Sequence, residues 1–144
     1  MDTREAASAL AHGFESLTPE RVGDLLRLYH PQARFKDPFN EVQGHEAIAQ
    51  IFHHMYRSLD RPHFVVTAQG VDGDQAFLTW EFRFHFRGAG ASGLQTVRGA
   101  THLLFDAQGL VTLHRDYWDA AEELYEKLPV LGSLMRWLKA RARS

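Results

Sequence analysis

The stretch from Gln75 to Arg87 constrains the fold most, because apolar and polar residues alternate almost strictly along it. The residues at one set of alternating positions are apolar and mostly aromatic: Ala76, Leu78, Trp80, Phe82, Phe84 and Phe86. Those at the other set are polar or charged: Thr79, Glu81, Arg83, His85 and Arg87. A period of two is typical of a β-strand with one buried face. The pattern therefore predicts a long strand that turns an aromatic face toward the core.

Other segments with the same period flank this strand and are separated from it by turn residues. The Asp72-Gly73 pair is a strong hairpin signal, and a second turn is predicted at 106–109. Short turns join strands in antiparallel pairs, so we expect an antiparallel meander. Its strands are predicted at 63–70, 75–87, 94–105 and 110–118.

Helical periodicity precedes and follows the meander. Helices are predicted from Met1 to Ser16, from Thr18 to the His30-Pro31 pair, and from Gly44 to Leu59. A short edge strand, Ala33–Asn40, separates the second helix from the third. After the meander we expect a helix at 120–128 and an amphipathic basic segment at 133–143. That basic segment packs on its own domain or on a partner subunit, or else touches a membrane surface.

Composition excludes several classes of function. The chain has 144 residues, 44% of them hydrophobic and 24% charged, as expected for one soluble globular domain. A net charge of −2 gives no electrostatic case for nucleic-acid binding, and the lack of cysteine excludes disulfides, thiolate metal sites and a cysteine nucleophile. Met1–Ala11 is too polar for a secretory leader, and no stretch is apolar enough to span a membrane, so we expect a cytoplasmic protein.

No cofactor or metal ion is expected from the motifs. The chain has no glycine-rich phosphate-binding motif. His53 and His54 are adjacent on a predicted helix and therefore point in different directions, which argues against a shared metal ion.

Asp37 is the first candidate for chemistry, because it lies between Phe35 and Phe39 and is followed by Pro38. A carboxylate in apolar surroundings is suited to work as a general acid or base. Alternatively, Asp37 accepts backbone N–H groups in a turn around Pro38 and Asn40, a common role for aspartate next to proline. The eight residues of this stretch leave both interpretations open.

Three segments resemble the nuclear transport factor 2-like superfamily: 28–38, 44–48 and 103–111. This superfamily contains ketosteroid isomerases, SnoaL-type polyketide cyclases and limonene epoxide hydrolases, together with proteins that are not enzymes. The resemblance implies one α+β domain over residues 1–144. In it, three N-terminal helices pack on a curved antiparallel sheet in the shape of a cone, and a helical extension follows at 120–144.

Two aspartates match functional positions of this superfamily. Asp37 corresponds to the general base of ketosteroid isomerases, whose reaction also requires an oxyanion hole. The oxyanion donors of those enzymes fall near Phe14 and Thr101, so that hole is incomplete here. Asp116 corresponds to an aspartate of limonene epoxide hydrolases, but the partner positions fall at about Trp80 and Phe82, which disfavours epoxide hydrolysis.

These matches predict one internal pocket. Its catalytic residues are Asp37, Asp116 and His114, and its walls are Phe14, Phe35, Trp80, Phe82, Val97, Thr101, Leu103 and Trp118. The expected function is proton transfer on a small apolar cyclic carbonyl compound; the alternative is a non-catalytic binding or dimerisation module. Asp116 could instead pair with Arg115, Arg83 or Arg98, and His114 could be a hydrogen-bonded core histidine.

We also expect a homodimer through the polar face of the sheet. The residues predicted there are Glu81, Arg83, His85, Arg87, Arg98, His102 and Leu104. Their mixed charges, with Leu104 and Tyr117 nearby, are typical of a partly polar two-fold contact. A solvated sheet face is the alternative.

Overall fold

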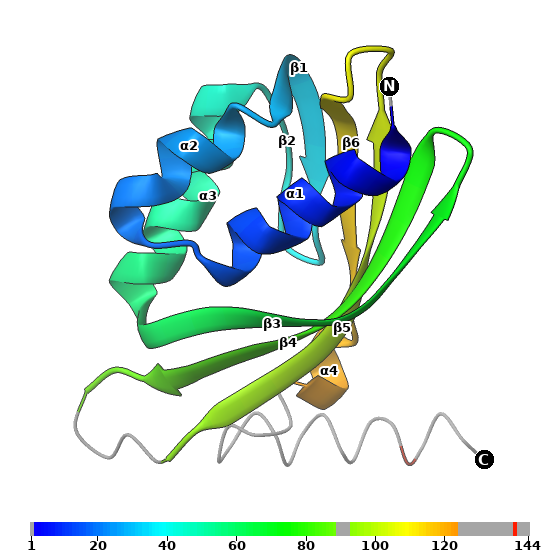
Figure 1. Cartoon of the computed structure of the whole chain (residues 1–144). Coiled ribbons are helices and arrows are strands. Elements are labelled where there is room, and N and C mark those ends of the chain that lie inside the picture. The colour runs from blue at the N-terminus through cyan, green and yellow to red at the C-terminus, as the bar shows by residue number, and fades with distance from the viewer. Residues whose placement is uncertain (1, 89–92, 124–139, 141–144) are drawn as a thin grey trace.

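The computed structural model describes residues 2–88, 93–123 and 140 (Figure 1). The helical elements are α1 (Thr3–Glu15), the 3-10 turn η1 (Pro19–Arg21), α2 (Val22–Leu26), α3 (His45–Ser58) and α4 (Ala120–Glu123). The strands are β1 (Tyr29–Lys36), β2 (Glu41–Gln43), β3 (Leu59–Asp72), β4 (Gln75–Phe86), β5 (Gln95–Phe105) and β6 (Val111–Tyr117).

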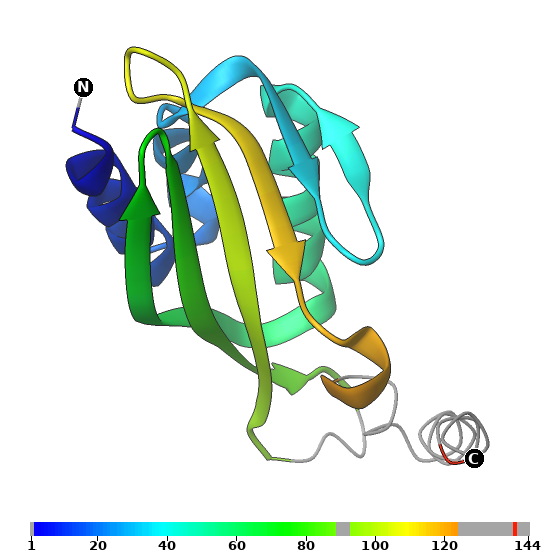
Figure 2. The ribbon, with the colours of Figure 1, turned by 90° about the vertical axis from the view of Figure 1, so that its right-hand side faces the viewer.

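The strands form one curved six-stranded sheet in the order β2-β1-β6-β5-β4-β3. Helices α1, α2 and α3 lie against its concave face, whereas Figure 2 shows no described helix over the central part of the opposite face. The predicted meander is confirmed, since β3, β4, β5 and β6 pair in antiparallel fashion.

The expectation of a purely antiparallel sheet is wrong, because β1 pairs with β6 in parallel. Hairpin signals specify only neighbouring strands, and β1 and β6 are separated by α3 and the whole meander. The β1–β6 register shifts between Tyr29 and Arg34, a segment that contains Pro31. Proline has no N–H group to donate, which explains a break in the ladder at this place.

The second predicted helix is shorter than expected. It ends at Leu26, and Tyr29 begins β1 opposite Val111 of β6. Residues that precede a proline disfavour the helical backbone conformation, so the chain near Pro31 is already extended. Similarly, Leu59 begins β3 rather than ending α3, and β2 was not predicted at all.

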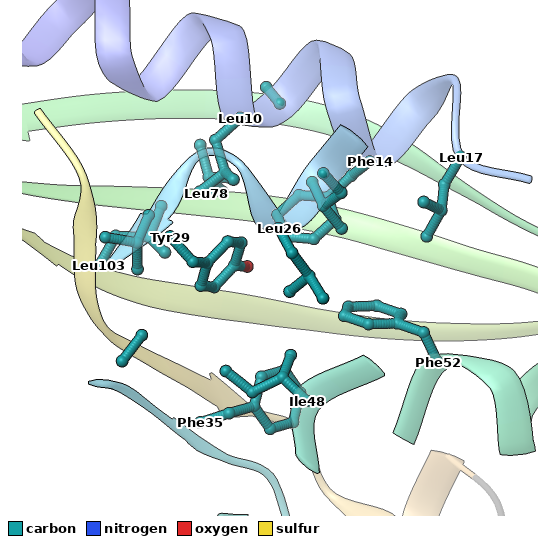
Figure 3. Close-up of a cluster of buried hydrophobic side chains, with 14 of the residues drawn as sticks. Leu10, Phe14, Leu17, Leu26, Tyr29, Phe35, Ile48, Phe52, Leu78 and Leu103 are labelled. Atoms are coloured by element: carbon teal, nitrogen blue, oxygen red, sulfur yellow. The ribbon is translucent and has the colours of Figure 1, made fainter. Parts of the chain in front are cut away.

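The core lies between the helices and the concave face of the sheet. Asp2 caps α1 by accepting hydrogen bonds from the N–H groups of Arg4 and Glu5. Figure 3 shows side chains from α1, α3, β1 and the central strands converging on one cluster. The labelled members are Leu10, Phe14, Leu17, Leu26, Tyr29, Phe35, Ile48, Phe52, Leu78 and Leu103.

The alternation along β4 is confirmed, since Ala76, Leu78, Trp80 and Phe84 are buried. Of the helix predicted at 120–128, α4 covers Ala120–Glu123. The rest of it, the basic segment at 133–143 apart from residue 140, and residues 89–92 lie outside the described residues. Within the described part of the chain, no helix is long and apolar enough to cross a membrane.

Candidate functional site

A cavity of about 330 Å³ lies between the second half of α3, the turn after β1 and the C-terminal half of β4. Its walls are mainly aromatic, and nine rings contribute to them: Phe35, Phe39, Phe52, Phe64, Trp80, Phe82, Phe84, Phe86 and Trp118. Two carboxylates, Asp37 and Asp116, also line it. An apolar space with a few polar groups is the usual form of a small-molecule site.

Asp116 is held in this wall by two hydrogen bonds to the same oxygen. Its Oδ1 accepts from Thr101 Oγ1 at 2.6 Å and from His114 Nε2 at 2.7 Å. The register explains both contacts, because Thr101 lies opposite Asp116 on β5, and His114 is two residues earlier on the same face of β6. Among the described residues, none makes a hydrogen bond to Asp116 Oδ2, and the Asp116 side chain is 17% exposed. The Oδ1 atom of the carboxylate is thus held by two hydrogen bonds, whereas no described residue holds its Oδ2 atom.

The hydrogen bonds continue beyond Asp116 in two directions, and donor chemistry fixes their order. The indole of Trp80 can only donate, so it donates to Thr101 Oγ1 at 2.8 Å, and the Thr101 hydroxyl donates to Asp116. His114 uses its Nε2–H toward Asp116, so its Nδ1, 2.6 Å from Tyr29 Oη, accepts the proton of the phenol. With Asp116 as a carboxylate and His114 as a neutral imidazole, this assignment gives each of the four hydrogen bonds from Trp80 to Tyr29 one proton.

Tyr29 forms the buried end of this network. Burial, followed by the negative charge of Asp116, raises the pKa of Tyr29 well above its usual value of 10.0. The phenol therefore remains a donor at neutral pH. His114, stacked against Tyr29 and in contact with the ring of Phe35, is the hydrogen-bonded core histidine that the sequence left open.

Asp37 lies in the turn after β1 rather than within a strand. Its Oδ1 accepts from the backbone N–H groups of Phe39 at 2.8 Å and Asn40 at 2.7 Å. The Asn40 side-chain amide also lies 3.1 Å from Oδ1 and 3.2 Å from Oδ2. This is the turn arrangement that the sequence offered as the alternative to a catalytic base. Asp37 nevertheless shares the cavity wall with Asp116 and Trp80.

The remaining predicted wall residues divide between two spaces. Phe35, Trp80, Phe82, Val97 and Trp118 line the large cavity. Phe14, Thr101 and His114 instead border a gap of about 20 Å³, shared with Trp80 and Asp116, which has room for about one water molecule.

Leu103, predicted as a wall residue, lines neither the large cavity nor the small gap. It is fully buried and lies in the cluster with Leu10 and Leu78 (Figure 3). The cone is closed by packed side chains at this level, so Leu103 belongs to the core. The alternative ion pairs of Asp116 are not formed either, since Arg83 pairs with Glu81 and Arg98 with Glu123.

Tyr29 is the member of the Asp116 network that the sequence did not indicate, because it was placed on the second predicted helix. Phe64, Phe84 and Phe86 were missed as wall residues too, although the period of β4 already assigned Phe84 and Phe86 to the buried face. In residues 2–88 and 93–123, no group of three or more histidine, aspartate or glutamate side chains is placed to hold a metal ion.

Comparison with known proteins identifies relatives at two levels. The sequence profile of the SnoaL-like domain matches residues 10–114, which is most of the chain. No curated protein matches the chain in sequence.

Solved structures with the same fold are more distant in sequence. TsrD from Streptomyces laurentii is 22% identical, with a TM-score of 0.72 over 90% of this chain and 98% of TsrD. A protein of ketosteroid isomerase-like fold from Catenulispora acidiphila, solved in complex with trimethylamine, is 21% identical, with a TM-score of 0.71 over 85% of this chain and 92% of that one. A candidate polyketide cyclase from Pseudomonas putida is 15% identical, with a TM-score of 0.71 over 89% and 98%. At these identities the likeness extends to the fold alone.

Proposed function

The chain belongs to the SnoaL-like domain family, and from that premise we propose that it transfers a proton on a small apolar cyclic carbonyl compound bound in the aromatic cavity. Asp116 is the base in this proposal, in place of Asp37. His114, Thr101 and Tyr29 act through Asp116 and are positioning residues.

The observation that carries the proposal is the asymmetry of the Asp116 carboxylate. Thr101 and His114 both hold Oδ1, and no described residue makes a hydrogen bond to Oδ2. A general base needs a free lone pair and a fixed orientation, and the contacts of Asp116 support its assignment to this role. Asp37 fits this role less well, because three donors already hold its Oδ1 in the turn.

The reaction that fits this geometry is the shift of a double bond next to a ketone. Asp116 Oδ2 removes a proton from the carbon between the carbonyl and the double bond. The electron pair of that C–H bond moves toward the carbonyl and forms a dienolate. Asp116 then returns the proton to the far end of the double bond, which gives the conjugated ketone and restores the carboxylate. The aromatic walls bind the ring and exclude water.

A non-catalytic binding module is the second candidate, and the donors of the site favour it. Trp80 donates to Thr101 and Thr101 to Asp116, so neither is left to stabilise an enolate oxygen. Loss of one oxyanion donor typically costs about 2.7–4 kcal/mol of barrier. We therefore expect a slow catalyst if the protein is an enzyme.

The isomerisation of cyclohex-3-enone to cyclohex-2-enone tests the proposal. The product can be followed by its ultraviolet absorption, and exchange from D₂O can be measured by mass spectrometry. Asp116→Asn is expected to lower the rate by about 100-fold or more, because the amide cannot take the proton. The amide Oδ1 of the variant still accepts from Thr101 and His114, so the melting temperature should change little.

Asp37→Asn is the matched comparison, since it makes the same change at the other aspartate of the cavity wall. We expect it to lower the rate by less than about tenfold. A larger loss in Asp37→Asn than in Asp116→Asn would move the base to Asp37. Binding of ring ketones without any exchange above the buffer rate would favour the binding module.

A further inference from the structure

The charges on the cavity wall point to a class of ligand that the fold alone does not specify. We propose that the cavity binds a compound whose apolar skeleton carries a positively charged nitrogen, either a protonated or a quaternary amine. This inference rests on the proposed function and narrows its substrate to a cyclic amino ketone.

Among the described residues, the cavity wall carries two aspartates and no lysine or arginine. Asp37, Asp116 and His54 are the titratable residues that line it, and no described lysine or arginine does so. His54 makes a long contact of 3.4 Å with Ser58. A positively charged ligand complements the charge of these two aspartates.

The basic residues closest in sequence to the two aspartates are engaged outside the cavity. Lys36 pairs with Glu41 on β2 at 3.7 Å, and the guanidinium of Arg115 lies 4.6 Å from the ring centre of Tyr117. Both border a separate, open depression that Asp37 and Asp116 also line. In the aromatic cavity the same two aspartates share the wall with nine rings and with no described lysine or arginine.

Aromatic rings reinforce the preference for a cation. The face of an aromatic ring carries partial negative charge and attracts ammonium groups, most strongly where water is excluded. Nine rings surround this space, and Phe64 and Phe82 are stacked with their centres 4.6 Å apart. Carboxylates and ring faces thus favour the same sign of charge on the ligand.

A positively charged nitrogen on the substrate also compensates for the lack of hydrogen-bond donors to the enolate oxygen in the proposed reaction. When the enolate forms, Asp116 has taken the proton and is neutral, so the new negative charge develops in a cavity that still holds the Asp37 carboxylate. The nearest donors, Trp80 and Thr101, already serve Asp116. A positive charge on the substrate offsets the enolate charge without any donor from the protein.

A pair of probes that differ only in charge tests this inference on the full chain. Choline and its neutral isostere 3,3-dimethylbutan-1-ol have nearly the same shape and hydroxyl group. Two of the three tryptophans of the chain, Trp80 and Trp118, line the cavity, so tryptophan fluorescence reports its occupancy. We expect choline to bind at least about tenfold more tightly than the alcohol.

Two substitutions locate the origin of that preference. Asp116→Asn should reduce the preference for choline over the alcohol several-fold. Asp24→Asn removes the same charge from the exposed surface of α2, where Asp24 pairs with Arg27, and should leave the preference intact. If Asp116→Asn does not fold, Asp37→Asn takes its place, with the same expected direction.

Equal or tighter binding of the alcohol by the wild-type protein would overturn the inference. The same holds if neither probe binds at millimolar concentration, or if the preference for choline survives in both Asp116→Asn and Asp37→Asn. Neither probe has a carbonyl group, so these results are independent of the cyclohex-3-enone assay. If the protein isomerises a neutral ring ketone but binds choline no more tightly than the alcohol, the proposed function is supported and the inference of an amine ligand is rejected.

Discussion

Tyr29 determines the order of protons in the polar network. It is 1% exposed, and its hydroxyl lies 2.6 Å from His114 Nδ1. Because that hydroxyl donates, His114 keeps its other proton on Nε2 and presents it to Asp116. A residue on the first strand thereby orients a carboxylate on the last.

Tyr29→Phe measures how much the hydrogen bond between Tyr29 and His114 contributes to the stability of the fold. The substitution leaves the buried Nδ1 of His114 without its donor, which typically costs about 1–3 kcal/mol. We expect the free energy of unfolding at pH 7 to fall by that amount in urea denaturation. An unchanged free energy would show that a water molecule replaces the hydroxyl.

The same variant should change the response to alkaline pH. The folded-state pKa of Tyr29 is raised above its usual 10.0, so the folded protein holds the phenolic proton more tightly than the unfolded chain. This contribution to stability is fully present below pH 10 and is lost as the pH rises through the folded-state pKa. The pKa of Tyr56 is raised to about 12, so Tyr56 changes stability with pH in the same direction in wild type and in Tyr29→Phe. Parallel stability curves for wild type and Tyr29→Phe above pH 10 would contradict the assignment.

Part of the candidate site could be predicted from sequence, and the reason is local geometry. His114 and Asp116 are two residues apart on a strand and must share a face. Thr101 lies opposite Asp116 on β5, in a register that shifts between Leu104 and Phe105, so the turn after β5 did not specify this pair by itself. Tyr29 could not be predicted, since its contact depends on the parallel pairing of distant strands. The role of Asp37 depended on the backbone of its turn, which the sequence left open.

At the element scale, β4 and β5 approach each other closely where Trp80 lies opposite Gly99. A Cβ atom built on Gly99 would lie 2.5 Å from Cη2 of the Trp80 ring. The glycine therefore leaves space for the indole, and that position lets Trp80 donate to Thr101.

Gly99→Ala should force the indole out of this position. We expect a loss of about 1–3 kcal/mol in the free energy of unfolding, typical of overpacking, and an altered near-ultraviolet circular dichroism spectrum. Gly70→Ala on β3 is the matched control, because a Cβ atom there meets nothing within 4 Å. Equal stability of the two variants would show that Trp80 has room to move.

Elements with a local signal were predicted well, and elements without one were not. The hairpin at Asp72-Gly73 and the alternation in β4 specify neighbouring strands within a few residues. The end of α2 and the start of β1 depend instead on the pairing of Tyr29 with Val111. Tertiary pairing overrode the helical period of that segment.

At the scale of the whole molecule, the convex face of the sheet is a broad surface that takes no part in the candidate site (Figure 2). Phe77 and Tyr117 are 47% and 49% exposed there, although large apolar groups usually find cover. Phe77 stacks on His102, and Arg83 pairs with Glu81 on the same face. Aromatic groups among paired charges are typical of a partly polar protein–protein contact.

We propose that two copies of the chain meet through this face in a two-fold homodimer. In such a contact each residue near the axis lies close to its own symmetry mate.

Light scattering at micromolar concentration should return a particle of twice the 16.4 kDa of one chain. Glu81→Arg should shift the equilibrium toward the monomer, because it breaks the pair with Arg83 and concentrates positive charge on both copies. Asp24→Arg, on the exposed surface of α2, should leave the dimer intact. A wild-type particle with the mass of one chain, unchanged by Glu81→Arg, would refute the dimer and leave these residues as an ordinary solvated sheet face.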